Sequence, residues 1–486
     1  MKELSLKTRV ASAFAAEARA VSNFFRFGRR SDKKDFITPG LHAYTIERNG
    51  GITRLHLRVE NNGTGTLFAD VSDAVSLSPS AVEMVWLALN HFDERSAINR
   101  LLLKYRGVNR LELTIHYRRM AGLVDKLSDP KNTCRTCSID YSPTFERKPL
   151  FSIRANAPYK ADLALTYACN NACPHCYNEP DRSAIETMST DEWKSTVDRL
   201  ADIGVPHLIF TGGEPTLHNG LTEIISHAHS RGLICGINTN ARRLSNPAFL
   251  RELVESGLDH VQVTLHSYNA TVHDKMAGTP AFHETVAGLK AALECRHSLH
   301  VITNTTLTRT NAMEAEKTVR FLHSLGLRTF AMNALIHAGG GKESSDVLPN
   351  DFLAALLVQI REVAAELSMR FLWYTVSRYC ELSPMELDIG AKRCNAAEYS
   401  ICIEPNGDVL PCQSYYSAAG NILGDSWQSI WESNLFQSFR DRETNPVAGS
   451  MPEKCLDCPD LSVCGGGCRL ENEARCKGCN GQTSCL

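Results

Sequence analysis

The sequence predicts an α/β protein built around a parallel sheet, with a small α+β module before it and a cysteine-rich region after it. Three observations support this prediction. Between residues 161 and 336, apolar strand candidates alternate with helical segments, as is typical of parallel βα units. Short alternating runs with turn residues precede this region. Most of the 18 cysteines lie within it or after it.

The first module, residues 36–130, is expected to contain a small sheet followed by three helices. Alternating runs between Leu41 and Val71 are separated by Asn-Gly and Asn-Asn-Gly, which favour hairpins. Helices are expected from the cap at Ser78 to Leu89, from Glu94 to Tyr105 and from Leu113 to Leu127. This order resembles the winged-helix-like leader-peptide recognition element of enzymes that modify ribosomally made peptides. An unrelated α+β module also fits the pattern.

Two segments flank this module. Residues 1–35 form a basic, partly amphipathic arm, whose apolar stretch is interrupted by Glu17 and Arg19, so it is a poor signal peptide. Residues 131–160 form a linker that contains Cys134 and Cys137. A lone Cys-x2-Cys fits half of a metal site, a redox pair or two ordinary loop thiols.

Residues 161–345 contain the alternating strands and helices. The expected helices are Asp191 to Ile203, Leu221 to Arg231, Pro247 to Ser256, Ala281 to Arg296 and Ala312 to Leu325. The expected strands are Asp162 to Thr166, His207 to Thr211, Ile234 to Asn238, His260 to His266, His300 to Thr306 and Thr329 to Asn333. Because every strand is followed by a helix or a long loop, the pattern predicts a parallel assembly.

Three cysteines, Cys169, Cys173 and Cys176, follow the first strand in a Cys-x3-Cys-x2-Cys loop. A cubane cluster has four irons, so three thiolates leave one iron open for a ligand. Pro174 stiffens the turn, and Tyr177 is placed to cover the outer face. Zinc remains an alternative, because His175 could join the cysteines in a zinc site.

The cysteine loop is followed, one helix and one strand later, by Phe-Thr-Gly-Gly-Glu-Pro (Phe210 to Pro215). Together these motifs resemble the radical S-adenosylmethionine (SAM) superfamily. The resemblance implies a partial (β/α)6 barrel and a 4Fe-4S cluster whose open iron is chelated by SAM. It also implies that the loop of Gly212, Gly213, Glu214 and Pro215 meets the SAM amino group, and that the reaction starts with hydrogen abstraction by a 5'-deoxyadenosyl radical.

Polar residues stand at the carboxyl ends of the later strands, where loops of such a barrel converge. Asn238 and Asn240 are suited to bind ribose hydroxyls, or to cap the following turn. Asn304 and Asn333 end the fifth and sixth strands. His266 stands where many peptide-modifying relatives carry a Ser-Leu-Asp-Gly sequence. It is expected to be satisfied by local hydrogen bonds, with a substrate-facing role as the alternative. The sequence identifies no catalytic base.

After Gly339-Gly340-Gly341, residues 346–390 form a helical connector with a helix from Asn350 to Leu367. Residues 391–486 contain the cysteine pattern that resembles the SPASM extension, which in relatives binds one or two auxiliary 4Fe-4S clusters. The resemblance implies a first auxiliary cluster on Cys394, Cys412 and Cys468, with Cys402 as fourth ligand. The second falls to Cys455, Cys458 and Cys464, with Cys485 favoured over Cys476 and Cys479 as its fourth ligand.

Two other interpretations concern the remaining cysteines. A zinc ribbon is an alternative for Cys455 to Cys468, because four thiolates also suit zinc. Cys235, Cys295 and Cys380 lie in apolar sequence and are expected to be inert core residues.

Composition fits a large cytoplasmic enzyme. The chain has 486 residues with 52 basic and 54 acidic side chains, which gives no reason to expect nucleic acid or a membrane as partner. Clustered cysteines in a long chain indicate metal ligation in a reducing compartment rather than disulfides.

The sequence therefore favours a radical SAM/SPASM enzyme that modifies a ribosomally synthesised precursor peptide and receives electrons from a reductant such as flavodoxin or ferredoxin. The alternatives are a maturase that acts on a folded protein or small molecule, as sulfatase-maturing enzymes do, and a peptide-binding scaffold whose clusters are only structural.

Overall fold

The computed structural model describes residues 28–29, 37–48, 51–69, 73–129, 155–296, 298–342, 344–445 and 451–472. The chain divides into two compact units, Met1–Ile153 and Arg154–Leu486. Most of the predicted arm, the linker cysteines Cys134 and Cys137, and the tail cysteines Cys476, Cys479 and Cys485 lie outside the described residues.

Unit 1 contains an antiparallel sheet in the order β2-β3-β4-β5 and three helices. The strands are β2 (Gly40–Arg48), β3 (Gly51–Val59), β4 (Gly65–Ala69) and β5 (Asp73–Leu77), with a short pair formed by β1 (Gly28–Arg29) and β6 (Tyr105–Arg106). The helices are α2 (Pro79–Leu89), α3 (Glu94–Lys104) and α4 (Arg110–Leu127). The predicted α+β module is confirmed, and β5 is a strand that the sequence pattern did not reveal.

Capping residues explain where the helices of unit 1 begin. Ser78 accepts a hydrogen bond from the backbone N–H of Ala81, and Asp93 accepts one from Ser96. Helix α4 begins three residues earlier than expected because Asn109 and Glu112 form a capping box. The apolar core is formed by residues of β3, β4 and the three helices, and α2 packs against both α4 and the sheet.

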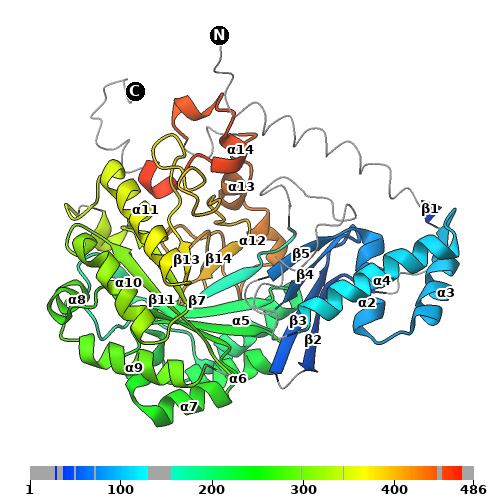
Figure 1. Ribbon diagram of the computed structural model, residues 1–486, viewed down its shortest axis with the longest axis horizontal. Coiled ribbons are helices and arrows are strands. Elements are labelled where there is room, and N and C mark those ends of the chain that lie inside the picture. The colour runs from blue at the N-terminus through cyan, green and yellow to red at the C-terminus, as the bar shows by residue number, and fades with distance from the viewer. Residues whose placement is uncertain are drawn as a thin grey trace. The chain divides into compact units, whose positions relative to one another are not determined.

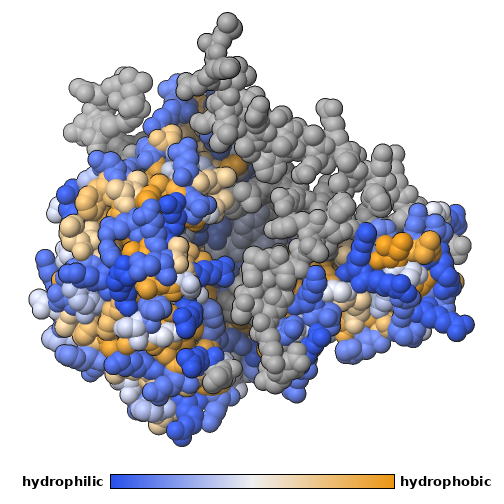
Figure 2. Space-filling model, in the orientation of Figure 1, coloured by the Kyte–Doolittle hydropathy of each residue, from blue (hydrophilic) through white to orange (hydrophobic). Residues whose placement is uncertain are grey.

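Unit 1 also contains a buried ion pair and several exposed apolar side chains. Lys104 and Glu83 form an ion pair in the core, and the Tyr105 hydroxyl donates to the same carboxylate at 3.0 Å. On the surface, Leu103 and Leu111 are among the exposed large apolar residues, and Figure 2 shows an apolar patch on this unit.

Unit 2 is built on one mixed sheet in the order β13-β12-β11-β10-β9-β8-β7-β14-β15. All neighbouring pairs are parallel except β14 and β15, which are antiparallel. The strands are β7 (Lys160–Thr166), β8 (His207–Gly212), β9 (Ile234–Thr239), β10 (His260–Thr264), β11 (His300–Leu307), β12 (Thr329–Ala334), β13 (Arg370–Trp373), β14 (Ser400–Ile403) and β15 (Val409–Leu410).

The helices of unit 2 alternate with the strands and lie along the outside of the curved sheet (Figure 1). They are α5 (Thr190–Ile203), α6 (Leu221–Ser230), α7 (Pro247–Glu255), α8 (Ala270–Ala277), α9 (Phe282–Glu294), α10 (Ala315–Ser324) and α11 (Asn350–Glu366). Short helices α12 (Trp427–Trp431), α13 (Asn434–Arg440) and α14 (Leu461–Cys464) follow near the C-terminus. In Figure 2 the surface along α6 and α7 is mainly hydrophilic.

The six predicted strands and the helices between them agree with the structure to within a few residues. The partial (β/α)6 barrel is thereby confirmed, with β13 and β14 added at its two edges. One difference matters for the site. The strand expected to run to His266 ends at Thr264, and α8 follows because Asn269 caps its first turn. Among the described helices, none is both long enough and apolar enough to cross a lipid bilayer.

Candidate iron-sulfur and cofactor site

The cysteine loop follows β7 directly and brings Cys169, Cys173 and Cys176 together. Cys169 is exposed and the other two are half-buried. Burial raises the pKa of the Cys173 thiol to about 12, and the charges of Cys176 and Cys169 contribute to this rise. The pKa of Cys169 is also raised by burial, although a hydrogen bond of 3.4 Å from the Asn171 N–H opposes this effect. The three thiols are therefore close enough for the charge of one to affect the pKa of another.

Three segments from distant parts of the chain hold the backbone of this loop. The Glu214 N–H donates to the Ala168 carbonyl at 2.8 Å, and the Gly340 N–H donates to the Cys176 carbonyl at 2.8 Å. The Ala172 N–H in turn donates to the Ala277 carbonyl, at the end of α8, at 2.9 Å. Backbone hydrogen bonds to three distant segments thus fix the loop at Ala168, Ala172 and Cys176.

Glycines make these close approaches possible. A Cβ atom on Gly213 would lie 2.5 Å from the Tyr167 carbonyl oxygen and nearer still to that of Ala168. A Cβ atom on Gly340 would collide with the Pro174 carbonyl oxygen. Gly213 and Gly340 are therefore required for packing against the cysteine loop, a role that the sequence pattern did not reveal. The segment Gly339–Gly341 is part of the site rather than a simple break in the chain.

Glu214 joins the ends of β8 and β9. Its buried carboxylate accepts hydrogen bonds from the hydroxyls of Thr216 at 2.7 Å and Thr239 at 2.6 Å, and from the Asn240 N–H at 2.8 Å. Burial raises the pKa of Glu214, and these donors act in the opposite direction. The carboxylate holds the Gly-Gly loop against the neighbouring strand, and Pro215 begins a short 3₁₀ helix after it.

The end of β9 contacts the cysteine loop through side chains. The Asn240 amide donates to Asn170 Oδ1 at 2.6 Å, while its own Oδ1 accepts the Arg242 N–H at 3.0 Å. Arg242 also donates to Asn171 Oδ1 at 3.1 Å. The turn-capping interpretation of Asn240 therefore describes the geometry, and Asn238 is half-buried near the end of the same strand.

Three histidines connect the cysteine loop with the segment after β10. The ring centroids of His175 and His266 are 4.9 Å apart, and those of His266 and His273 are 5.5 Å apart. Burial lowers the pKa of His266 well below its ordinary value, and it lowers the pKa of His273 to about 4. Both rings are therefore neutral near pH 7.

The prediction that local hydrogen bonds satisfy His266 is wrong. Its side chain is buried, yet neither ring nitrogen has a hydrogen-bond partner among the described residues. Two polar atoms near the end of β11, Asn304 Oδ1 and Thr308 Oγ1, are also buried without hydrogen-bond partners in the described part of the chain. Asn333 accepts a hydrogen bond from the Asn304 amide at 2.9 Å. Buried polar atoms of this kind indicate a binding site for a polar ligand.

The C-terminal region docks on the barrel beside the cysteine loop. Strand β14 pairs with β7, so that Cys402 lies opposite Asp162. Arg182 donates to both oxygens of the buried Glu404 carboxylate at 2.9 and 3.0 Å, and its guanidinium lies 4.4 Å from the Tyr416 ring centroid. The Tyr167 hydroxyl donates to the same carboxylate.

Tyr177 belongs to this contact between the two regions. Its hydroxyl donates to Gln413 Oε1 at 3.5 Å, and its carbonyl oxygen accepts the Tyr416 hydroxyl at 3.2 Å. Burial raises the pKa of Tyr177, and the charge of Cys176 adds to the effect. Tyr177 therefore stands between the cysteine loop and the C-terminal region.

A first group of C-terminal thiols contains Cys394, Cys412 and Cys468. Burial raises the pKa of Cys412 to about 12, with contributions from the charges of Cys394 and Cys468, and the pKa of Cys468 to about 11, with a contribution from Cys394. Backbone N–H groups of Ser414 and Tyr415 act in the opposite direction on Cys412. Cys402 is buried beside Ala164 and Leu410, and its thiol is affected by the charge of Cys412.

A second group contains Cys455, Cys458 and Cys464, and Cys380 follows Tyr379, whose backbone N–H donates to Cys464 Sγ at 3.3 Å. Burial raises the pKa of Cys455, with contributions from the charges of Cys464, Cys380 and Cys458. The expectation that Cys380 is a core residue is wrong, because its side chain is exposed. Cys235 is buried as expected, whereas Cys295 is half-buried.

Comparisons with known proteins agree with this geometry. The model of the radical SAM superfamily matches residues 163–322, and that of the SPASM iron-sulfur cluster-binding domain matches residues 394–459. The PqqA peptide cyclase of Bradyrhizobium diazoefficiens is 30% identical over 335 residues, which are 65% of this chain and 82% of the relative. This chain belongs to the radical SAM superfamily.

Two further proteins resemble this radical SAM chain. The AdoMet-dependent heme synthase of Methanosarcina barkeri is 29% identical over 330 residues, 65% of this chain and 92% of the relative. The crystal structure of SuiB from Streptococcus suis bound to the precursor peptide SuiA superposes with a TM-score of 0.62 at 17% identity, covering 85% of this chain and 94% of SuiB. Unit 2 makes up about two thirds of the chain, so this match in fold extends into unit 1.

The residues present fit the cofactors of the radical SAM/SPASM family, which are 4Fe-4S clusters and SAM. Burial raises the pKa of Cys173 and Cys176, and bonding of their thiolates to cluster iron would offset this effect. Among the described residues, no three His, Cys, Asp or Glu side chains converge as ligands of a single metal ion. The thiolates of a cubane cluster each bind a different iron and therefore stand apart.

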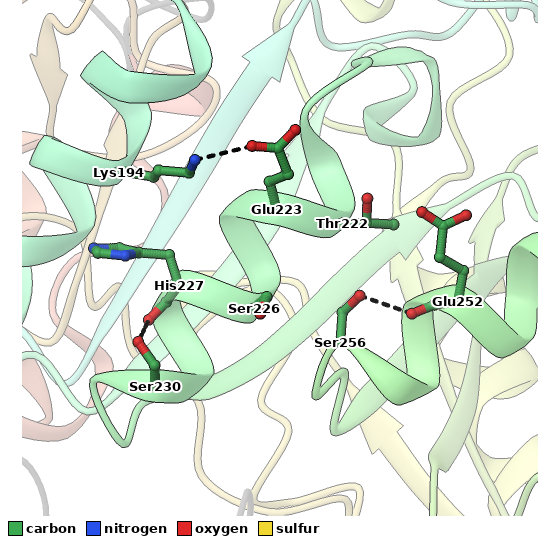
Figure 3. Close-up of a pocket in the computed structure, with 8 residues that line it drawn as sticks. All are labelled: Lys194, Thr222, Glu223, Ser226, His227, Ser230, Glu252 and Ser256. Atoms are coloured by element: carbon green, nitrogen blue, oxygen red, sulfur yellow. Dashed lines mark hydrogen bonds and ion pairs between the residues drawn. The ribbon is translucent and has the colours of Figure 1, made fainter.

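A hollow of about 500 Å³ lies on the outer helices of the radical SAM barrel rather than at its cysteine loop (Figure 3). It is lined by residues of α5, α6 and α7, including Lys194 and Glu223, whose side chains form an ion pair of 2.9 Å. None of the predicted cofactor residues lines it.

Proposed function

We propose that this radical SAM/SPASM enzyme modifies a residue of a ribosomally synthesised precursor peptide. The observation that carries the proposal is the three-thiol loop at the carboxyl end of β7, in a chain that also has a separate sheet module before the barrel. Relatives support the substrate class. One is a cyclase of the PqqA peptide, and the structural neighbour SuiB is bound to a precursor peptide.

The three loop thiols Cys169, Cys173 and Cys176 would hold the cluster that binds SAM. When bound, the cluster and SAM supply the 5'-deoxyadenosyl radical that removes a hydrogen atom from the peptide. We propose that SAM contacts come from Tyr177, Asn238, Asn240 and the loop Gly212–Pro215. Glu214 positions this loop through its bonds to Thr239 and Asn240.

His266 extends the set that sequence reasoning identified. Its buried, neutral ring lies beside the cysteine loop and can donate one hydrogen bond and accept another. We assign it to binding of SAM or of the peptide backbone. The signal in the sequence was its place two residues after the end of β10.

The C-terminal cysteines would hold two auxiliary clusters. Cys394, Cys412 and Cys468, with Cys402 as the fourth thiol, form the set proposed for the first. Cys455, Cys458 and Cys464 belong to the second. Such clusters can accept the electron that remains when a substrate radical forms a new bond.

Unit 1 would hold the leader segment of the peptide. Its sheet has the nine-residue strand β2 at one edge, and β2 pairs only with β3 among the described strands. An extended peptide can add to such an edge through main-chain hydrogen bonds. Protection of the amides of residues 40–48 from hydrogen exchange upon addition of a peptide would test this assignment.

The remaining proposals concern boundaries and surroundings. The arm would comprise residues 1–35, the module 36–130, the linker 131–160, the barrel 161–345, the connector 346–390 and the SPASM domain 391–486. The enzyme would work in the cytoplasm with a flavodoxin or ferredoxin as reductant, because clustered thiols require a reducing compartment.

The test uses the full-length chain, reconstituted anaerobically with iron and sulfide, reduced and given SAM. We expect 5'-deoxyadenosine to form, and we expect deuterium to move into it from a deuterated peptide encoded beside the gene. A peptide of unchanged mass in the presence of active SAM cleavage would contradict the substrate class. Absence of SAM cleavage with and without the peptide would contradict the enzyme and favour a scaffold.

A second substrate class has one specific observation in its favour. The relative from Methanosarcina barkeri is an AdoMet-dependent heme synthase, and a heme precursor is a small molecule. Deuterium transfer from a tetrapyrrole, with none from the peptide, would select this alternative.

A further inference from the structure

We propose that Cys380 is the fourth ligand of the second auxiliary cluster, completing the set formed by Cys455, Cys458 and Cys464. The sequence pattern instead favoured Cys485 for this role. The inference goes beyond the proposed function, because it does not depend on which substrate the enzyme modifies.

The segment around Cys380 packs directly against the second cysteine group. The backbone N–H of Tyr379, the preceding residue, donates to Cys464 Sγ at 3.3 Å. A Cβ atom on Gly467 would lie 2.7 Å from Arg378 Cγ and 3.2 Å from the Arg378 backbone nitrogen. The two segments, about 85 residues apart in the chain, are therefore in contact at Cys464 and at Gly467. An N–H donor to a cysteine sulfur also stabilises the thiolate form.

The thiols of this group occupy complementary positions. Cys455 and Cys464 are buried, Cys458 is half-buried and Cys380 is exposed. A cluster near the surface can be bound by two inner and two outer thiolates, and the burial of these four cysteines is compatible with that division.

A second, independent feature of the group is Arg378. Its side chain is only 6% exposed, and one end of the guanidinium pairs with Glu381 at 2.7 Å. Its Nε–H is buried and has no hydrogen-bond partner among the residues that the structure describes. A cluster on the four thiols would carry negative charge, so a sulfur of that cluster suits this buried donor.

A fourth thiolate closes the ligand set of the second cluster. A closed set leaves no iron free to bind the substrate, so the cluster would serve to carry electrons. The hydrogen bond from Arg378 would then help to set its reduction potential, because donors to the sulfurs favour the more negative, reduced form.

The experiment compares full-length holoproteins that carry Cys380→Ser, Cys485→Ser or the control Cys295→Ser. Iron and sulfide content, Mössbauer spectra and electron paramagnetic resonance spectra are measured under anaerobic conditions. With three intact 4Fe-4S clusters the protein holds about 12 irons. We expect Cys380→Ser to lower this to about 8, or to about 11 if a three-iron cluster remains, while Cys485→Ser and Cys295→Ser keep the wild-type content.

Two results would overturn the assignment. One is a Cys380→Ser protein whose iron content and spectra equal those of the wild type. The other is loss of iron from all clusters alike, including the one whose spectrum responds to SAM, since that would show general misfolding.

Arg378→Met provides a second measurement. It keeps the four thiols, so we expect full iron content and a more negative midpoint potential of one auxiliary cluster in a redox titration. An unchanged potential would contradict the placement of the guanidinium against this cluster.

Discussion

The cysteine loop of the barrel and the cysteine groups of the C-terminal region gather thiols for iron-sulfur clusters in different ways. Cys169, Cys173 and Cys176 come from eight consecutive residues, and other parts of the chain only hold their backbone in place. The ligand set proposed for the second auxiliary cluster instead combines Cys380 with thiols more than 70 residues later in the chain. A motif can specify the first kind of site by spacing alone. The second kind exists only after the chain has folded.

This difference affects what each site needs for assembly. The barrel loop depends on close packing by Gly213 and Gly340, so its shape is set by steric exclusion. The C-terminal region depends on buried polar contacts, chiefly that of Arg182 with Glu404, which join it to the barrel. Substitutions of these two kinds should therefore have separable effects on the clusters.

The largest expected effect breaks the local site itself. In Cys173→Ser the loop retains only two thiols, so we expect no detectable 5'-deoxyadenosine and a loss of about four irons. The auxiliary signals should remain, because their thiols come from other segments. The measurement combines iron analysis with chromatographic detection of 5'-deoxyadenosine. Retained SAM cleavage would place the active cluster elsewhere.

The next effect concerns the contact between the regions. Arg182→Met leaves the Glu404 carboxylate, only 1% exposed, without its cationic partner, and such a change costs about 3–5 kcal/mol of folding stability. Urea unfolding followed by fluorescence would measure it. Arg320→Met is the matched control, because Arg320 forms its ion pairs with Glu316 and Glu366 at the surface. Equal losses in both variants would mean that the Arg182 contact is not structural.

A smaller effect tests the packing of the cysteine loop. Gly213→Ala and Gly340→Ala each place a methyl group against a loop carbonyl, and we expect the cluster that binds SAM to be held about 10- to 100-fold more weakly. Gly122→Ala on α4 is the control, because a Cβ atom there meets nothing within 4 Å. Iron retention during chelator challenge would be compared. If all three variants retained iron equally, steric exclusion would not shape the loop.

Most of the barrel could be predicted from the sequence, because short apolar strands and the helices between them are local patterns. Asn269 and α8 were missed because a single Asn cap in a short helix gives little periodic signal. Strands β14 and β15 were missed because they are short and depend on pairing with β7. Elements with a strong local sequence pattern could thus be predicted, and short elements that depend on tertiary contacts could not.

The chemistry of the site followed the same rule. The three loop cysteines and the Gly-Gly-Glu-Pro segment were identified because their spacing is local. The roles of His266 and Cys380 were misjudged because burial and exposure depend on contacts with distant segments. Likewise, nothing in the sequence shows that Gly340 packs on Pro174, since their contact spans about 165 residues.

The smallest expected effect concerns the hydrogen bond between Thr239 and Glu214, which joins the ends of β8 and β9. Thr239→Val removes one donor to Glu214, and we expect a loss of about 1–2 kcal/mol near neutral pH. Burial raises the folded pKa of Glu214, so its contribution to stability is greatest at low pH and declines as the pH rises through that pKa. The Thr239 hydroxyl opposes this decline by favouring the carboxylate. The difference in unfolding free energy between variant and wild type should therefore grow with pH in a series of urea titrations, and a difference independent of pH would mean that the hydroxyl does not act on the charge of Glu214.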